Sequence, residues 1–254
     1  VAAECGLAPG TKIVMGGGDG LCASVGAGSI RPGVAYTCLG SSAWVAVASE
    51  TPIFDEKMRL VNWAHIVPGL VAPIGTMQTA GAAFSWLKRE LAVYEAQLGR
   101  QRGMSPYDII NDMIASSRPG SNGLIFLPYL MGERSPRWNA NARGAFVGLK
   151  MEHERKDIFR SVIEGIAMNL RLILDIQRGQ LDIAEMTVIG GLARGDVQRQ
   201  IFADVFGLEI HKANYLEEAT SMGAAITAGV GVGALPGFEA VNRFIATDDV
   251  KKPN

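Results

Sequence analysis

The sequence has little cysteine, little histidine and almost no excess charge, and each shortage excludes a class of protein. The three cysteines, Cys5, Cys22 and Cys38, lack C-x-x-C spacing, so neither a disulfide framework nor a zinc site is predicted. The three histidines are scattered without ligand spacing, and we expect no metal site built by this chain alone. With 24 basic and 25 acidic residues the net charge is −1, which argues against nucleic acid as a partner. A small-molecule ligand is therefore the better prediction.

Long apolar runs are absent as well. Two of the longest, Leu70 to Ile74 and Val188 to Leu192, fall far short of the roughly 20 residues of a membrane-spanning helix. We expect a soluble, cytoplasmic protein without a membrane partner. The chain has 254 residues and is 48% apolar, which is enough for a sizeable core. Its ends, Val1 to Gly6 and Lys251 to Asn254, look like interrupted elements, and we expect a piece of a longer protein.

Strand-like and helix-like segments alternate along the chain, which predicts an α/β fold with layers of helices on a sheet. Strands are predicted at residues 11–15, 34–39, 44–48, 60–67, 70–77, 124–127 and 186–189, and helices at 20–28, 79–96, 106–115, 155–177, 196–206 and 220–231. Residues 132–143 combine polar, aromatic and charged side chains and predict an ordered functional loop. Arg134 and Arg137 in this loop could touch phosphate, but surface salt bridges are the plainer expectation.

The first of three glycine turns is Gly16-Gly17-Gly18-Asp19. It puts a carboxylate at the start of a helix, where no side chains block a ligand. The ordinary alternative is that Asp19 caps the helix. A dinucleotide-binding turn is disfavoured because the G-x-G-x-x-G spacing is missing.

The other two turns also consist of small residues. Gly40-Ser41-Ser42 forms the tip of the hairpin predicted between residues 34 and 48, and such a tip can direct N–H and hydroxyl donors at phosphate oxygens. Gly190 to Gly195 lies between a strand and a helix and could admit an adenine ring against bare backbone. An ordinary hairpin and an ordinary βα turn remain the alternatives. Neither a P-loop pattern nor G-x-S-x-G occurs.

A longer pattern gives these turns their context. One segment resembles the second signature of the FGGY carbohydrate kinases without a gap. It consists of Gly144 to Leu149, then seven residues, then Asp157 to Glu164. Phe126 to Pro136, worded as in the xylulokinases, and Ser221 to Ala225 follow the same family's order. The resemblance covers nearly the whole chain. It implies an actin-like, ribonuclease H-like ATPase fold, with a mixed sheet flanked by helices, in a protein that phosphorylates a sugar or polyol hydroxyl with ATP and Mg²⁺.

The resemblance also assigns roles to residues of this sequence. It implies that Asp19 is the catalytic base and that the hairpin tip, Gly40, Ser41 and Ser42, is the phosphate-binding turn. It also implies that four glycines form the adenosine site: Gly81, Gly190, Gly191 and Gly195. Leu192 and Gly195 depart from the family pattern, which usually has a third glycine and then serine or asparagine. The Mg²⁺ would be held partly by a carboxylate outside this chain.

Domain organisation and substrate follow from the same resemblance. Residues 1–30 would end the family's amino-terminal domain and carry Asp19, and residues 31–254 would form the carboxy-terminal nucleotide-binding domain. The expected partner is the missing amino-terminal kinase domain, with a homodimer left open. The expected acceptor is a pentulose such as xylulose. The alternatives are an ATP-dependent switch of the actin or chaperone type, which would hydrolyse ATP without sugar, and a sugar sensor without catalysis.

Overall fold

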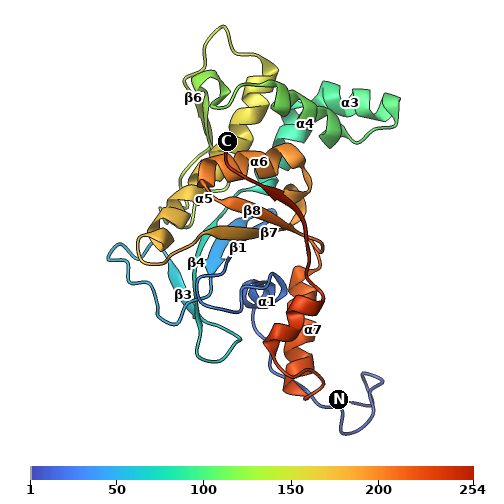
Figure 1. Cartoon of the computed structure of the whole chain (residues 1–254). Coiled ribbons are helices and arrows are strands. Elements are labelled where there is room, and N and C mark those ends of the chain that lie inside the picture. The colour runs from blue at the N-terminus through green and yellow to red at the C-terminus, as the bar shows by residue number, and fades with distance from the viewer. Residues whose placement is uncertain (1) are drawn as a thin grey trace.

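The computed structural model describes residues 2–254, and its main feature is a mixed sheet between two layers of helices (Figure 1). The strands of this sheet are β1 Ala35–Leu39, β2 Ala43–Val47, β3 Val61–Ala64, β4 Val71–Met77, β7 Glu185–Ile189, β8 Glu209–Ala213 and β9 Thr247–Lys251. They lie in the order β3-β4-β2-β1-β7-β8-β9. Two further strands, β5 Ile125–Leu127 and β6 Ala145–Val147, form a separate antiparallel pair.

Strand directions bring the predicted turns to one edge of the sheet. β1 runs parallel to β7, with Cys38 opposite Ile189, so the carboxyl ends of both strands lie together. β1 and β2 form an antiparallel hairpin in which Leu39 lies opposite Ala43. The hairpin predicted from the sequence is therefore confirmed, and residues 40–42 are its tip.

Successive side chains of a strand point to opposite faces of the sheet, and each face packs against a different layer of helices. On β1, Ala35 and Leu39 pack in the core with α5 (Arg155–Arg178) and α6 (Asp196–Phe206). The intervening Tyr36 packs in a second cluster with α1 (Asp19–Gly26) and α7 (Ala219–Gly231). Both faces of the central strands are covered, which explains why β1 and β2 read as nearly continuous apolar runs.

The outer layers differ in one place from the prediction. The single helix expected over residues 79–96 is wrong: the segment divides into α2 (Gly81–Trp86), a π-helical turn (Leu87–Leu91) and α3 (Val93–Arg102). The π turn is closed by a hydrogen bond from the Ala92 N–H to the Leu87 carbonyl at 2.9 Å, and it redirects the chain so that α3 packs against α4. The remaining short elements are α4 Pro106–Ser116 and the 3-10 turns Ser121–Gly123, Gly191–Arg194 and Phe238–Arg243.

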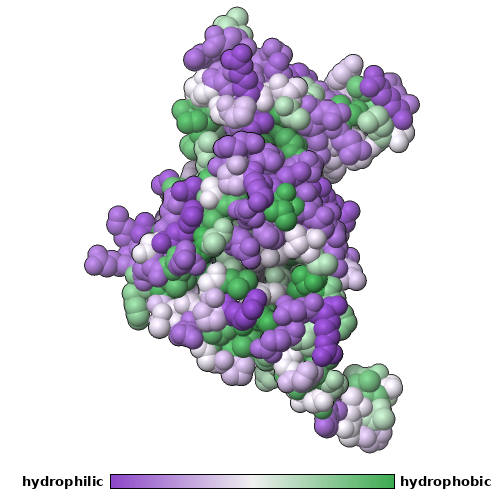
Figure 2. Space-filling model, viewed as in Figure 1, coloured by the Kyte–Doolittle hydropathy of each residue, from purple (hydrophilic) through white to green (hydrophobic). Residues whose placement is uncertain are grey.

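The strand predicted at residues 11–15 is also wrong. No described strand lies beside it to complete its hydrogen bonds, and the side chains of Ile13 and Met15 are 87% and 91% exposed. In Figure 2 the amino-terminal end at the lower right shows green and white atoms, in keeping with its apolar and small residues.

α1 and α7 cross at very short range. A Cβ on Gly26 would lie 1.7 Å from the Ala219 carbonyl oxygen, and a Cβ on Gly223 would lie 1.8 Å from the Cys22 carbonyl oxygen. Only glycine allows this approach. Among residues 2–254, no helix combines the length and apolar character that crossing a bilayer requires.

Candidate functional site

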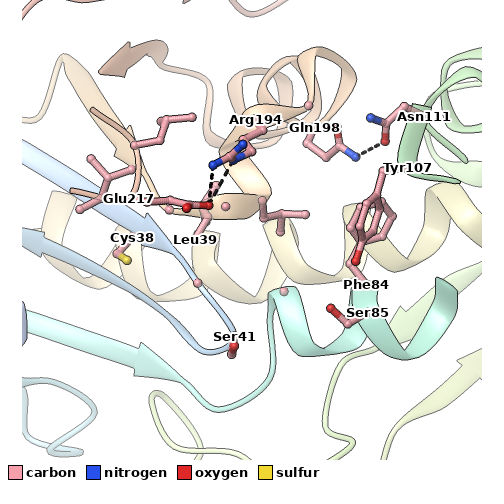
Figure 3. Close-up of a pocket in the computed structure, with 18 of the residues that line it drawn as sticks. Cys38, Leu39, Ser41, Phe84, Ser85, Tyr107, Asn111, Arg194, Gln198 and Glu217 are labelled. Atoms are coloured by element: carbon pink, nitrogen blue, oxygen red, sulfur yellow. Dashed lines mark hydrogen bonds and ion pairs between the residues drawn. The ribbon is translucent and has the colours of Figure 1, made fainter. Parts of the chain in front are cut away.

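Two cavities lie beside the hairpin tip. The larger has a volume of about 800 Å³ and opens where the carboxyl ends of β1 and β7 meet (Figure 3). Its lining is mostly small or polar and comes from five regions of the chain. These residues include Cys38, Leu39, Gly40, Ser41, Gly81, Phe84, Ser85, Tyr107, Asn111, Gly190, Gly191, Leu192, Arg194, Gly195, Gln198 and Glu217. An edge formed by the carboxyl ends of parallel strands is a common ligand site in α/β proteins.

Two glycines allow the backbone segments of this wall to touch. Gly190 has φ of +94°, and a Cβ there would lie 2.7 to 2.9 Å from backbone atoms of Leu39. Gly81 donates its N–H to the Gly40 carbonyl at 2.8 Å, and a Cβ on Gly81 would lie 2.6 Å from that oxygen. Bare backbone therefore forms one end of the cavity.

The hairpin tip is held by the start of α2. The Ser41 carbonyl accepts hydrogen bonds from the N–H groups of Ala80 at 2.9 Å and Ala82 at 3.0 Å. Together with the bond from Gly81 to Gly40, these contacts fix the turn between β1 and β2 against the segment that follows β4. The tip is thus a rigid part of the wall.

A second cavity, of about 350 Å³, lies on the other side of the tip. Asp19, Ser42, Trp44, Trp63 and Arg134 are among its lining residues. Asp19 is the first residue of α1, whereas Gly18 occupies the N-cap position. The exposed carboxylate of Asp19 accepts a hydrogen bond from the Gly20 N–H at 2.8 Å. The capping role considered from the sequence is therefore not the arrangement found.

A buried network connects the start of α1 to the hairpin strands. The Tyr36 hydroxyl donates to the Gly20 carbonyl at 2.5 Å and accepts a hydrogen bond from Trp44 Nε1 at 2.8 Å. Burial raises the pKa of the Tyr36 phenol, which keeps it a hydrogen-bond donor. The residue next to Asp19 is thus fixed relative to β1 and β2.

Arg134 lies in the loop that covers this second cavity. The salt bridge expected for Arg134 and Arg137 is not found: within residues 2–254 neither side chain pairs with a carboxylate. Arg137 instead donates to the Tyr129 hydroxyl at 3.0 Å. The Nε atom of Arg134 is buried without a hydrogen-bond partner among the described residues, and Arg134 is one of the residues that line this cavity.

Glu133 fixes the position of this loop. One carboxylate oxygen accepts the N–H groups of Gln78 and Arg134, both at 2.7 Å, and the other accepts Asn169 Nδ2 at 2.7 Å. Burial raises the pKa of Glu133, although these hydrogen bonds and the nearby Arg134 act in the opposite direction. The bonds join the loop to the end of β4 and to α5.

Charge in the larger cavity is sparse. Arg194 and Glu217 form an exposed ion pair at 2.9 Å on its rim. Burial raises the pKa of the Cys38 thiol to about 12, so Cys38 lines the cavity as a neutral group. Among the described residues there is no cluster of three or more His, Cys, Asp or Glu side chains in position to hold a metal. A divalent cation would therefore depend on ligands other than such a cluster.

All eight residues proposed from the sequence line one of the two cavities. Gly40, Ser41, Gly81, Gly190, Gly191 and Gly195 line the larger, and Asp19 and Ser42 line the smaller. The sequence missed Tyr107, Asn111 and Gln198 in the first cavity and set Arg134 aside in the second. Tyr107 and Asn111 lie on α4 and Gln198 lies on α6, outside every motif found in the sequence, so no local signal marked them. Arg134 lies in the segment from Phe126 to Pro136, which the sequence did single out.

The comparisons with known proteins agree with this architecture. Residues 35–232 match the model of the C-terminal domain of the FGGY family of carbohydrate kinases. A xylulose kinase of Staphylococcus epidermidis is 35% identical over 258 aligned positions, which cover 100% of this chain and 49% of that protein. A gluconokinase of Bacillus subtilis is 32% identical and covers 97% of this chain and 48% of its own length.

A solved structure gives the same picture. The ligand-bound xylulose kinase from Lactobacillus acidophilus superimposes with a TM-score of 0.87 at 28% identity, over 100% of this chain and 49% of that one. The actin-like ATPase fold expected from the resemblance is confirmed. The chain spans about half the length of the curated relatives it matches. It belongs to the FGGY family of carbohydrate kinases and contains the carboxy-terminal domain of that family.

Proposed function

We propose that this chain is the nucleotide-binding half of a kinase that transfers the γ-phosphate of ATP to a sugar or polyol hydroxyl, with Asp19 as general base. One observation carries the proposal: the hairpin tip stands between the two cavities. Gly40 and Ser41 line the larger cavity, while the next residue, Ser42, lines the one that holds Asp19. Donor phosphate and acceptor hydroxyl would meet at this tip.

The larger cavity suits a nucleotide. Its volume of about 800 Å³ is within the usual range for ligand pockets. Backbone at Gly40, Gly81 and Gly190 can approach phosphate and ribose closely because no side chains intervene. Mg²⁺, when bound to the nucleotide, would neutralise phosphate charge. Part of the coordination of this Mg²⁺ would come from a carboxylate outside this chain.

The smaller cavity would receive the acceptor. Asp19 would accept the proton of the hydroxyl as that oxygen attacks the γ-phosphate. Trp44 and Trp63 offer apolar faces, and Ser42 and Thr76 offer hydroxyls. The relatives include kinases named for a neutral ketose and for a sugar acid. We retain a pentulose such as xylulose as the first candidate. Arg134 lines this cavity and forms no ion pair with a carboxylate among residues 2–254, which supports gluconate as the second candidate, because a guanidinium binds carboxylate well.

Several wider expectations belong to the same proposal. Residues 1–30 would end the amino-terminal domain, and residues 31–254 would form the carboxy-terminal nucleotide-binding domain. The partner would be an amino-terminal kinase domain, and the location would be cytoplasmic. The two rival functions make different demands. An actin-like or chaperone-like switch would hydrolyse ATP without sugar, and a sugar sensor would bind sugar without transferring phosphate.

The decisive experiment measures ADP release by a two-domain protein in which an FGGY amino-terminal domain precedes residue 1. Xylulose, gluconate, other pentuloses, polyols and a no-sugar control are compared. Sugar-dependent ADP release with a matching phosphorylated product supports the proposal. Equal ADP release without sugar would favour the switch, and sugar binding without product would favour the sensor.

A further inference from the structure

The larger cavity would receive a ligand with several negative charges, yet it offers little positive charge. Among the described residues that line it, Arg194 is the only lysine, arginine or histidine, whereas Asp108 and Glu217 are acidic. Backbone donors at the hairpin tip can bind phosphate oxygens, but they carry no net charge to balance the phosphates. A side chain of this cavity that neutralises phosphate would therefore have to be Arg194.

The backbone of Arg194 is held in place, while its side chain is exposed. Arg199 on α6 donates from Nη1 to the carbonyls of Ala193 at 2.8 Å and Arg194 at 3.0 Å. Gly190, at the start of the same turn, packs against the backbone of Leu39, the residue before the hairpin tip. The Arg194 side chain is 67% exposed. The guanidinium can thus change its partner by side-chain rotation alone.

The partner of Arg194 is Glu217, and the pairing uses only part of each group. Arg194 Nε and Nη2 both contact Glu217 Oε1, at 3.1 and 2.9 Å, whereas a bidentate pair would use both carboxylate oxygens. Figure 3 shows the two side chains pointing toward each other within the lining. Glu217 Oε1 would lie 3.3 Å from a Cβ on Gly191, so the pair borders the bare backbone of the turn. Exposed ion pairs of this kind are weak, and phosphate can displace the carboxylate.

We propose that Arg194 exchanges Glu217 for the nucleotide phosphates when ATP or ADP binds. The guanidinium would form charge-assisted hydrogen bonds to oxygens of the same phosphates that the hairpin tip binds. Glu217 holds Arg194 at the cavity before the nucleotide arrives and is then displaced. Arg194 is a phosphate-binding residue, and Glu217 is a positioning residue. This inference rests on the proposed nucleotide site and adds how this chain recognises the charge of its ligand.

The test separates recognition of phosphate from recognition of the nucleoside. Calorimetry compares ADP with adenosine on the 254-residue chain at constant Mg²⁺. Arg194→Met should weaken ADP binding about 10-fold, the scale of a hydrogen bond to a charged group, and leave adenosine binding within about 2-fold. Arg194→Lys keeps the charge but loses the planar fork, so its affinity for ADP should lie between those of the natural chain and Arg194→Met.

The partner variant should change ADP binding in the opposite direction. Glu217→Gln frees the guanidinium and removes a charge that repels phosphate, so ADP should bind about 2- to 5-fold more tightly, a gain limited by the weakness of an exposed ion pair. A poorly folded variant cannot produce such a gain. Lys150 and Glu152 form another exposed ion pair, outside both cavities. Lys150→Met and Glu152→Gln are the matched controls and should leave both affinities unchanged.

Three results would count against the inference. Equal loss of ADP affinity in Arg194→Met and Glu217→Gln would make the pair a structural tie beside the turn. Natural ADP affinity in Arg194→Met would overturn the inference and leave the nucleotide site standing. Failure of the natural chain to bind either ADP or adenosine would refute the nucleotide site itself, and the inference with it.

Discussion

At the scale of single residues, Asp19 decides whether the second cavity is a reaction site. We expect Asp19→Asn in the two-domain protein to lower kcat by about 10²-fold or more, the usual scale for a lost general base. Nucleotide affinity should stay within a few-fold because Asp19 lies outside the larger cavity. Coupled ADP detection and calorimetry give the two numbers. Asp175→Asn, on the exposed side of α5, is the matched control. Natural turnover in Asp19→Asn would move the base elsewhere.

Neighbouring glycines in the turn after β7 should respond differently to substitution. A Cβ on Gly191 would meet only Glu217 Oε1, at 3.3 Å, so Gly191→Val should fold and place its methyl groups in the larger cavity. We expect weaker ATP binding with sugar affinity unchanged. Gly190→Ala should instead reduce thermal stability, because its Cβ would collide with the Leu39 backbone. Calorimetry that showed sugar affinity falling while ATP affinity held would contradict the assignment of Gly191.

At the scale of elements, the crossing of α1 and α7 determines where Asp19 stands. Gly223→Val would force the helices apart, because even a Cβ would lie 1.8 Å from the Cys22 carbonyl oxygen. We expect the free energy of unfolding to fall by at least about 1–3 kcal/mol, the usual cost of overpacking. Urea titration measures this loss. Ala224→Val, at an exposed position of the same helix, should change stability little. Similar values for the two variants would mean that the helices can adjust.

The loop before β3 should respond to acid. Hydrogen bonds from the Arg59 guanidinium hold the pKa of Asp55 at about 2, below its ordinary value of 3.8. Because the folded-state pKa is the lower one, this contact stabilises the fold above pH 3.8, and the contribution is lost as pH falls toward 2. Asp55→Asn should lower stability at neutral pH and flatten this part of the acid profile. Glu56→Gln removes a charge from the same loop and serves as the control. Parallel profiles for the natural chain and Asp55→Asn would contradict the prediction.

At the scale of the whole molecule, we expect nucleotide binding to need only this chain and sugar phosphorylation to need a second domain. We expect the 254-residue chain to fold and to bind adenine nucleotide weakly but not to phosphorylate a sugar at a useful rate. Phosphoryl transfer depends on closing two domains around both substrates. Exposed apolar residues such as Ile13, Met15 and Trp63 should also favour self-association. Sugar-dependent ADP release and sedimentation measure both properties. Rates comparable to those of the two-domain protein would mean that this chain holds a complete sugar site.

The sequence by itself determined the features that depend on neighbouring residues. The hairpin with Gly40, Ser41 and Ser42 at its tip, the bounds of α6 and the amphipathic helix α5 all follow from local periodicity and turn chemistry. The motif order indicated the family, and the family model agrees. Local rules failed where a partner was needed: residues 11–15 have strand-forming side chains but no described strand beside them.

Only the tertiary structure decided which residues share a cavity. The parallel pairing of β1 with β7 brought Gly190 against Leu39, although these residues are far apart in the chain. The same packing paired Gln198 of α6 with Asn111 of α4 and brought Arg134 to the cavity that holds Asp19. Such contacts arise from the directions in which strands and helices cross. Periodicity fixes the face of each element, but not which other element will meet that face.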